Sequence, residues 1–164
     1  MRHLAALHVP QLAADPASPP AGHVAVYAGT DGQIRSKTPA GAVTVVPAGP
    51  RALPPYTITG PLQTVTGTYR LFNDTGRSWT IVAVRATVVT APAGSGLTVD
   101  VHKNGTTVFT NQANRPIIAA GTTTIKRTTI DVPTVADGDY LTVDVDAVGS
   151  TTPGSDLTVQ ITVV

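Results

Sequence analysis

The side chains best suited to chemistry in this chain are aspartates spaced two residues apart on predicted strands. Asp144 and Asp146 share one face of a strand, and Asp100 shares a face of another strand with His102. Carboxylate and imidazole groups at this spacing could bind a metal ion or hold the hydroxyl groups of a sugar. An ordinary solvated strand face accounts for the same four residues, and we favour that interpretation.

Aromatic side chains provide a second kind of candidate site. Trp79, with Tyr69 and Phe72 nearby in the sequence, could form a platform on which a sugar ring stacks. Packing in the core is the more common role for the single tryptophan of a β-sandwich. The weak candidate residues for a carbohydrate-binding site are Trp79, Tyr140, Asp144 and Asp146.

The segment Asp137-Gly138-Asp139 is a third candidate, because clustered carboxylate oxygens suit calcium. Asp and Gly also form turns for backbone reasons, and the segment lacks the spacing of an EF-hand loop. We therefore favour a turn that leads into a strand at Tyr140. We expect the protein to bind no metal ion and no cofactor.

Catalytic motifs are missing from the sequence. It contains no GxSxG elbow, no phosphate-binding P-loop, no HExxH metal motif and no dinucleotide-binding glycine pattern. Since there is no cysteine, a nucleophile would have to be a serine or threonine activated by one of only four histidines. Two of these, His3 and His8, lie in the N-terminal arm. We therefore predict that the protein is not an enzyme.

The composition predicts an all-β protein. The chain has 27 threonines, its 10 acidic residues are all aspartate, and only 3 of its 11 basic residues are lysine. Threonine and valine favour strands, whereas the glutamate and lysine that favour helices are scarce. A net charge of +1 without a clustered basic patch argues against nucleic-acid binding. No segment approaches the roughly 20 apolar residues of a membrane span, and the N-terminus lacks the apolar run of a signal peptide.

Alternation with a period of two predicts a β-sandwich of seven or eight antiparallel strands in residues 56–164. Its expected topology is jelly-roll or immunoglobulin-like. The clearest strands are the last two, in which apolar and polar side chains alternate along the whole run. The predicted strands are 64–73, 78–90, 97–103, 106–110, 122–130, 140–148 and 157–164, with a further short strand at 56–59.

Asn104-Gly105 is the strongest local signal, because this pair favours a two-residue type I′ turn in which both positions have positive φ. The turn would place His102 opposite Thr107 on neighbouring strands. The same register puts Phe109 on the polar face, which indicates either a covered surface or a different register.

Residues 1–55 have the pattern of an extended arm, a small β-hairpin or meander and a stiff linker. Ten of the 14 prolines precede residue 62, and alternating runs are short, near 24–28 and 42–46. A segment with so little to bury is not stable alone, so it should order against the main domain, copies of itself or another protein. We place the domain boundary between residues 55 and 56.

The order of these segments resembles a known family. PASPPAGHVAVYAGTDGQIRSKTPAGAVTVV is similar to the N-terminal region of small structural proteins of tailed bacteriophages of actinobacteria. In that region a proline-rich lead-in precedes a G-x-V-x-x-Y-x-x-x-D-G strand and turn, followed by K-x-x-x-G. The matching positions are Gly22, Val24, Tyr27, Asp31, Gly32, Lys37 and Gly41. KNGTTVFTNQANRPIIAAGTTT and ADGDYLTVDVDAVGSTTPGSDLTVQI resemble the β-sandwich that ends many of these proteins.

The resemblance implies a non-enzymatic structural component of the virion, of the head-decoration, head-fibre or minor tail type. Its N-terminal region would attach to capsid or tail proteins, and its β-sandwich would face outward from a homotrimer assembled in the host cytoplasm. The residues implied in attachment are Leu4, Leu7, Val9, Leu12, Val24, Val26 and Tyr27. The alternative function is a carbohydrate-binding module that attaches the particle to a glycan of the host surface.

Overall fold

The computed structural model describes residues 9–46 and 49–164. Strands dominate this part of the chain, and its one helical element is a short 3₁₀ turn, η1 (Gln112–Asn114). The predicted all-β fold class is therefore confirmed. The chain divides into two compact units between residues 48 and 49. Within the described ranges no helix is long and apolar enough to cross a membrane.

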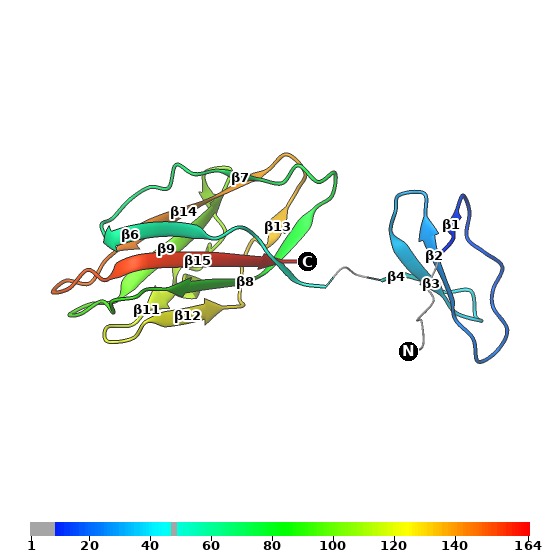
Figure 1. The fold of residues 1–164 in the computed structure, drawn as a ribbon, viewed down its shortest axis with the longest axis horizontal. Coiled ribbons are helices and arrows are strands. Elements are labelled where there is room, and N and C mark those ends of the chain that lie inside the picture. Colours follow the sequence, from blue (N-terminus) through cyan, green and yellow to red (C-terminus); the bar gives the residue numbers. More distant parts are fainter. Residues whose placement is uncertain (1–8, 47–48) are drawn as a thin grey trace, which may run out of the picture. The chain divides into compact units, whose positions relative to one another are not determined.

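The first unit is a small four-stranded sheet. Its strands are β1 (Gln11–Leu12), β2 (Ala25–Gly29), β3 (Ile34–Lys37) and β4 (Val43–Val45). They lie in the order β1-β2-β3-β4 (Figure 1). The last three form the predicted meander, and β1 adds to β2 in parallel. The sequence did not predict β1, because two residues carry no readable period.

One face of this sheet is covered by the chain that precedes β2. Tyr27 is buried there, and its hydroxyl donates a hydrogen bond to Asp15 Oδ1 at 2.5 Å. Lys37 Nζ donates to the carbonyl oxygen of Pro16 at 2.8 Å. Because side chains alternate along a strand, Val26 lies on the opposite face, where it is exposed.

The second unit, residues 49–164, is a sandwich of two antiparallel sheets. Its strands are β5 (Arg51–Ala52), β6 (Tyr56–Pro61), β7 (Leu71–Phe72), β8 (Trp79–Thr87), β9 (Leu97–Lys103), β10 (Thr106–Thr107), β11 (Ile117–Ile118), β12 (Thr124–Arg127), β13 (Thr134–Val135), β14 (Tyr140–Ala147) and β15 (Ser155–Val163). One sheet has the order β10-β9-β14-β7, and the other has the order β12-β8-β15-β5. The remaining short strands, β11, β13 and β6, pair with β9, β8 and β15 respectively.

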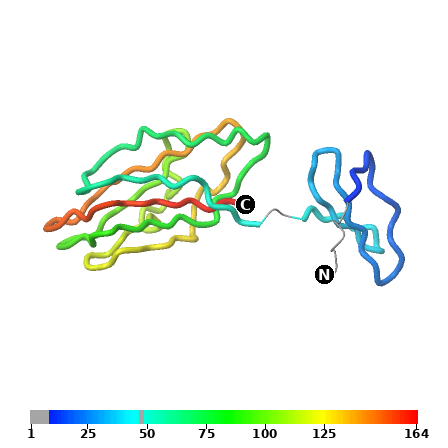
Figure 2. Tube along the Cα trace, in the orientation of Figure 1, coloured from blue at the N-terminus to red at the C-terminus, as the bar shows by residue number. Residues whose placement is uncertain are grey.

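The strand pairing identifies the topology as a jelly roll. β6 pairs with β15, β7 with β14, β8 with β12, and β9 with β10, so the chain is one long hairpin of nested strand pairs. Folding such a hairpin over itself produces two packed sheets. Figure 1 shows β6, β15, β8 and β12 side by side, and Figure 2 shows red β15 running next to teal β6.

The core lies between the two sheets. Alternate residues of β8, β9, β14 and β15 point into it, among them Val84, Val99, Val143 and Val159. Trp79 is buried in the same cluster. This burial agrees with the interpretation of the single tryptophan as a core residue.

The hairpin at Asn104-Gly105 forms as predicted, with His102 paired to Thr107 and positive φ at both turn residues. The predicted strand 106–110 is too long, however, because β10 ends at Thr107. Beyond it the chain turns inward, and Phe109 is fully buried in the core. Of the two alternatives for Phe109, the structure therefore agrees with a departure from the hairpin register, because burial of a large apolar ring outweighs three further residues of strand pairing.

The sandwich begins before the predicted boundary at 55/56. β5 pairs with the end of β15, and Leu53 N donates to the carbonyl oxygen of Ile161 at 2.8 Å. The Leu53 side chain is buried in the core of the sandwich. The stretch interpreted as a linker therefore contributes an edge strand, which at two residues is too short to show a period.

Candidate functional site

A groove on the outer face of the sandwich is lined by two of the four polar strand candidates, His102 and Asp144. It lies where β9 pairs with β14, next to residues 66–70, and has a volume of ≈ 370 Å³. Ligand pockets in proteins typically occupy about 300–1,000 Å³. The groove is lined by Thr66, Gly67, Thr68, Arg70, His102, Gly105, Tyr140, Thr142 and Asp144.

The register of β9 and β14 brings the polar groups together. Thr142 lies opposite His102, and Asp144 lies opposite Asp100, on the face that points away from the core. His102 Nδ1 is 3.1 Å from Asp144 Oδ2, and its Nε2 is 3.7 Å from Asp100 Oδ2. One imidazole is therefore flanked by two carboxylates from different strands.

Residues 66–70 form an arch along the edge of β14. Val65 pairs with Val145, and Leu71 pairs with Leu141. The chain therefore advances six positions between these two pairings, whereas β14 advances only four. The two extra residues bulge outward, as they do in an irregular edge strand. We call this segment the 66–70 arch.

The arch fixes Asp144 through a close backbone approach. Gly67 N donates a hydrogen bond to Asp144 Oδ1 at 2.9 Å, and the Asp144 side chain is largely buried. Only glycine fits here, because a Cβ atom on residue 67 would lie 2.0 Å from the carbonyl oxygen of Val143. Each carboxylate oxygen of Asp144 therefore has one partner, Gly67 for Oδ1 and His102 for Oδ2.

Asp100 is the deeper carboxylate, and it supports the site without lining the groove. Its Oδ1 accepts hydrogen bonds from Thr107 Oγ1 and Val101 N, both at 2.7 Å. Burial raises the pKa of the Asp100 carboxyl, and the two hydrogen bonds oppose that rise. Asp100 is thus a fixed acceptor behind the His102 ring.

Arg70 and the Tyr140 ring contact each other in the lining of the groove, and the Phe72 ring packs against Tyr140 from outside it. The guanidinium carbon of Arg70 lies 4.7 Å from the centroid of the Tyr140 ring, a cation–π contact. The rings of Tyr140 and Phe72 are 5.6 Å apart and inclined at 53°, and Phe72 is exposed. Among the described residues the Arg70 guanidinium has no hydrogen bond or ion pair, so its N–H donors are available to a ligand.

Two of the four weak carbohydrate candidates line the groove, Tyr140 and Asp144. Asp146 does not, because it forms an ion pair with Arg115 outside the groove. Trp79 is buried, and its Nε1 donates to Thr75 Oγ1 at 3.1 Å, so the ring offers no free face to a sugar.

Five residues of the groove were missed by sequence reasoning: Thr66, Gly67, Thr68, Arg70 and Thr142. The available signal was a glycine inside a predicted strand, which often marks a bulge or a close backbone approach. Arg70 carried no signal of its own, because its position depends on the bulge.

The Asp137-Gly138-Asp139 segment forms a turn, with a φ of 84° at Gly138. Asp137 Oδ1 accepts a hydrogen bond from Gly76 N, and Asp139 Oδ1 accepts one from Asn104 Nδ2, both at 2.6 Å. The bond from Asn104 lowers the pKa of the Asp139 carboxyl. In the residues that the structure describes, no group of three His, Cys, Asp or Glu side chains could hold a metal ion.

The residues implied in attachment are distributed as follows. Leu4 and Leu7 lie outside the described residues. Val9 and Leu12 are half-buried, whereas Val24 and Val26 are exposed and Tyr27 is buried inside the first unit.

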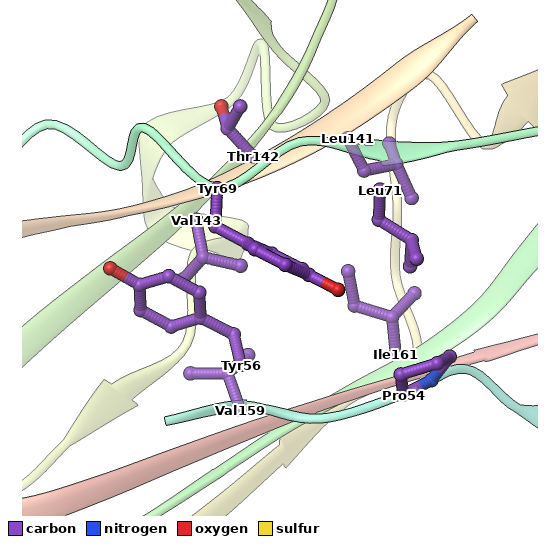
Figure 3. Close-up of a pocket in the computed structure, with 9 residues that line it drawn as sticks. All are labelled: Pro54, Tyr56, Tyr69, Leu71, Leu141, Thr142, Val143, Val159 and Ile161. Carbon is purple, nitrogen blue, oxygen red and sulfur yellow. The ribbon is translucent and has the colours of Figure 1, made fainter. Parts of the chain in front are cut away.

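A second, apolar cavity lies at the open edge between the two sheets (Figure 3). Tyr56 of β6 and Tyr69 of the 66–70 arch lie at its mouth, with ring centroids 6.5 Å apart at 47°. Its volume of ≈ 20 Å³ suits about one water molecule, so it is too small for a ligand. Two consecutive residues of the arch therefore line different sites. Tyr69 lines the apolar cavity, and Arg70 lines the groove.

The mixture of groups suits a small polar ligand. Arg70 supplies donors, Asp144 supplies acceptors, and the threonine hydroxyls supply both. Tyr140 adds an apolar surface, as is usual in ligand sites. Comparison of this chain with protein-family models, with curated proteins and with solved structures found no match.

Proposed function

We propose that the protein is a non-enzymatic structural component of a tailed-phage virion, a head-decoration, head-fibre or minor tail protein. The N-terminal unit anchors it to capsid or tail proteins, and the jelly roll is displayed on the particle surface. The sequence resemblance supports this role and a homotrimeric assembly. The division into two compact units provides the two parts that the role needs.

The observation that carries the proposal is the exposed apolar face of the N-terminal sheet. Val24 is 58% exposed and Val26 is 48% exposed, and alternation puts Ile34 and Val46 on the same face. Covering one valine stabilises a complex by about 1.5 kcal/mol or more before the costs of association. An apolar face on so small a unit therefore favours docking to a partner.

The sandwich is suited to display because it has a complete core of its own. Jelly rolls occur in viral capsid proteins and in lectins, so the fold is compatible with a surface role. The fold alone does not imply a function, and the anchoring role rests on the N-terminal unit.

The test is particle occupancy in phage carrying Val24→Thr together with Val26→Thr. Threonine keeps the branched shape that strands favour and removes apolar surface, so the unit should remain folded while its docking weakens. We expect the copy number per purified particle, measured by quantitative mass spectrometry, to fall about tenfold or more.

The matched control is Val89→Thr, at a valine of the sandwich that is 76% exposed. This variant should be incorporated at the wild-type level. Full occupancy of the Val24/Val26 variant would contradict docking through this face, and imaging of the wild-type particle would show which virion surface carries the protein.

A further inference from the structure

We propose that the groove between β9, β14 and the 66–70 arch binds a neutral saccharide, with Arg70, His102 and Asp144 as its hydrogen-bonding residues. This goes beyond the anchoring role, because it assigns a ligand to the displayed unit. The two roles can be tested separately, because the described residues that line the groove belong to the second unit.

Arg70 and Asp144 form a complementary donor and acceptor pair. The Arg70 guanidinium is stacked on Tyr140, so the group is held in place before any ligand binds. Asp144 accepts one hydrogen bond at each oxygen, and a carboxylate has about four acceptor sites, so it can accept more. Adjacent sugar hydroxyls can accept from the first group and donate to the second.

His102 lines the groove and lies between two carboxylates. Its Nδ1 lies 3.1 Å from Asp144 Oδ2, within hydrogen-bonding distance. Its Nε2 lies 3.7 Å from Asp100 Oδ2, too far for a direct hydrogen bond. A hydroxyl placed between Nε2 and Asp100 Oδ2 can hydrogen-bond to both groups, because a hydroxyl both donates and accepts, and a saccharide carries many hydroxyls.

Arg70 covers one face of the Tyr140 ring, and the remaining surface of that ring gives the groove an apolar wall for a sugar. Tyr140 lines the groove, and the adjacent Phe72 ring is exposed. Aromatic rings with a few convergent polar groups are the usual composition of small-ligand sites.

The charges favour a neutral ligand over an anion. Asp144 and the nearby Asp100 carry carboxylates, and among the described residues Arg70 is the one arginine or lysine that lines the groove. A phosphate or other strong anion placed beside Arg70 would be close to Asp144, and that like-charge repulsion works against it.

The experiment is saturation-transfer difference NMR on the full chain with D-glucose, D-galactose, D-mannose and N-acetyl-D-glucosamine at millimolar concentration. We expect transfer to at least one sugar. Arg70→Ala and Asp144→Asn should each weaken the dissociation constant about tenfold, the usual effect of losing a hydrogen bond to a charged group. Arg70 is exposed, so its variant should fold even if the Asp144 variant does not.

The matched control is Asp146→Asn, on the same strand as Asp144 but outside the groove, which should leave the dissociation constant unchanged within about twofold. Absence of transfer to all four sugars, or transfer that survives Arg70→Ala, would overturn the proposal. Binding of inorganic phosphate without any sugar would also overturn it, by making Arg70 an anion site. A variant that loses sugar binding and keeps particle occupancy separates this inference from the anchoring role.

Discussion

Gly67→Ala tests the 66–70 arch most directly. An added Cβ would lie 2.0 Å from the carbonyl oxygen of Val143, whereas a carbon–oxygen contact needs about 3.3 Å. The arch must therefore move by about 1.3 Å away from β14. A movement of this size breaks the 2.9 Å hydrogen bond from Gly67 N to Asp144 Oδ1.

The size of the effect follows from that bond. A hydrogen bond to a charged group contributes about 1.5–3 kcal/mol, and Asp144 is 5% exposed, so water replaces the lost donor poorly. We expect the free energy of unfolding of the sandwich to fall by about 2 kcal/mol, which lowers its melting temperature by about 8 °C. The same movement displaces Arg70, so saccharide binding should weaken as well.

Guanidinium unfolding followed by tryptophan fluorescence is the suitable assay, because Trp79 is the single tryptophan and is buried in the sandwich. Gly49→Ala is the control, since an added Cβ there meets no atom within 4 Å and the residue has no positive φ. A free energy of unfolding for Gly67→Ala within about 0.5 kcal/mol of the wild type would refute the reasoning.

Three further substitutions are predicted to change stability in the same fluorescence assay. Phe109→Ala should lower the free energy of unfolding by about 3–5 kcal/mol, because the ring is fully buried. Thr110→Ala, at the exposed neighbouring residue, should change it little. Equal effects of the two substitutions would contradict the burial of Phe109 in the core. Asn73→Ala should cost about 3 kcal/mol, because the buried amide donates to three main-chain carbonyls, and a loss under about 1 kcal/mol would argue against that role. Burial raises the pKa of Asp100 in the folded state, so its contribution to stability falls as pH rises from the ordinary carboxyl pKa to the raised one. Asp100→Asn should remove this fall, and an unchanged pH profile between about pH 3 and 7 would count against it.

The longest strands could be predicted from the sequence because each buries one face. The predicted strand 97–103 coincides with β9, and 140–148 and 157–164 differ from β14 and β15 by one or two residues at their ends. Period-two alternation is the direct result of one-sided burial, so it is strongest where a strand lies in the middle of its sheet. The hairpin at Asn104-Gly105 was predicted for a different reason, the positive φ that its turn demands.

The rest depended on contacts between distant parts of the chain. The predicted strand 64–73 became an arch followed by β7, because its register against β14 holds two extra residues. β5, β11 and β13 are each two residues long, and they form strands only by pairing with the longer strands β15, β9 and β8 respectively. Asp144 and Tyr140 were identified as weak ligand candidates, whereas Arg70 was not, since only the bulge carries it to the groove.

The nested hairpin has a consequence for synthesis of the chain on the ribosome. β15 occupies the middle of its sheet, between β8 and the pair β5 and β6, yet it is made after all of them. Until it emerges, the facing edges of β8 and β6 have no partner and their apolar sides stay open to other nascent chains. Pairing across about a hundred residues also makes closure slow, on the order of milliseconds to seconds. Fast translation at high expression should therefore increase aggregation, and slower elongation or a lower temperature should increase the soluble yield.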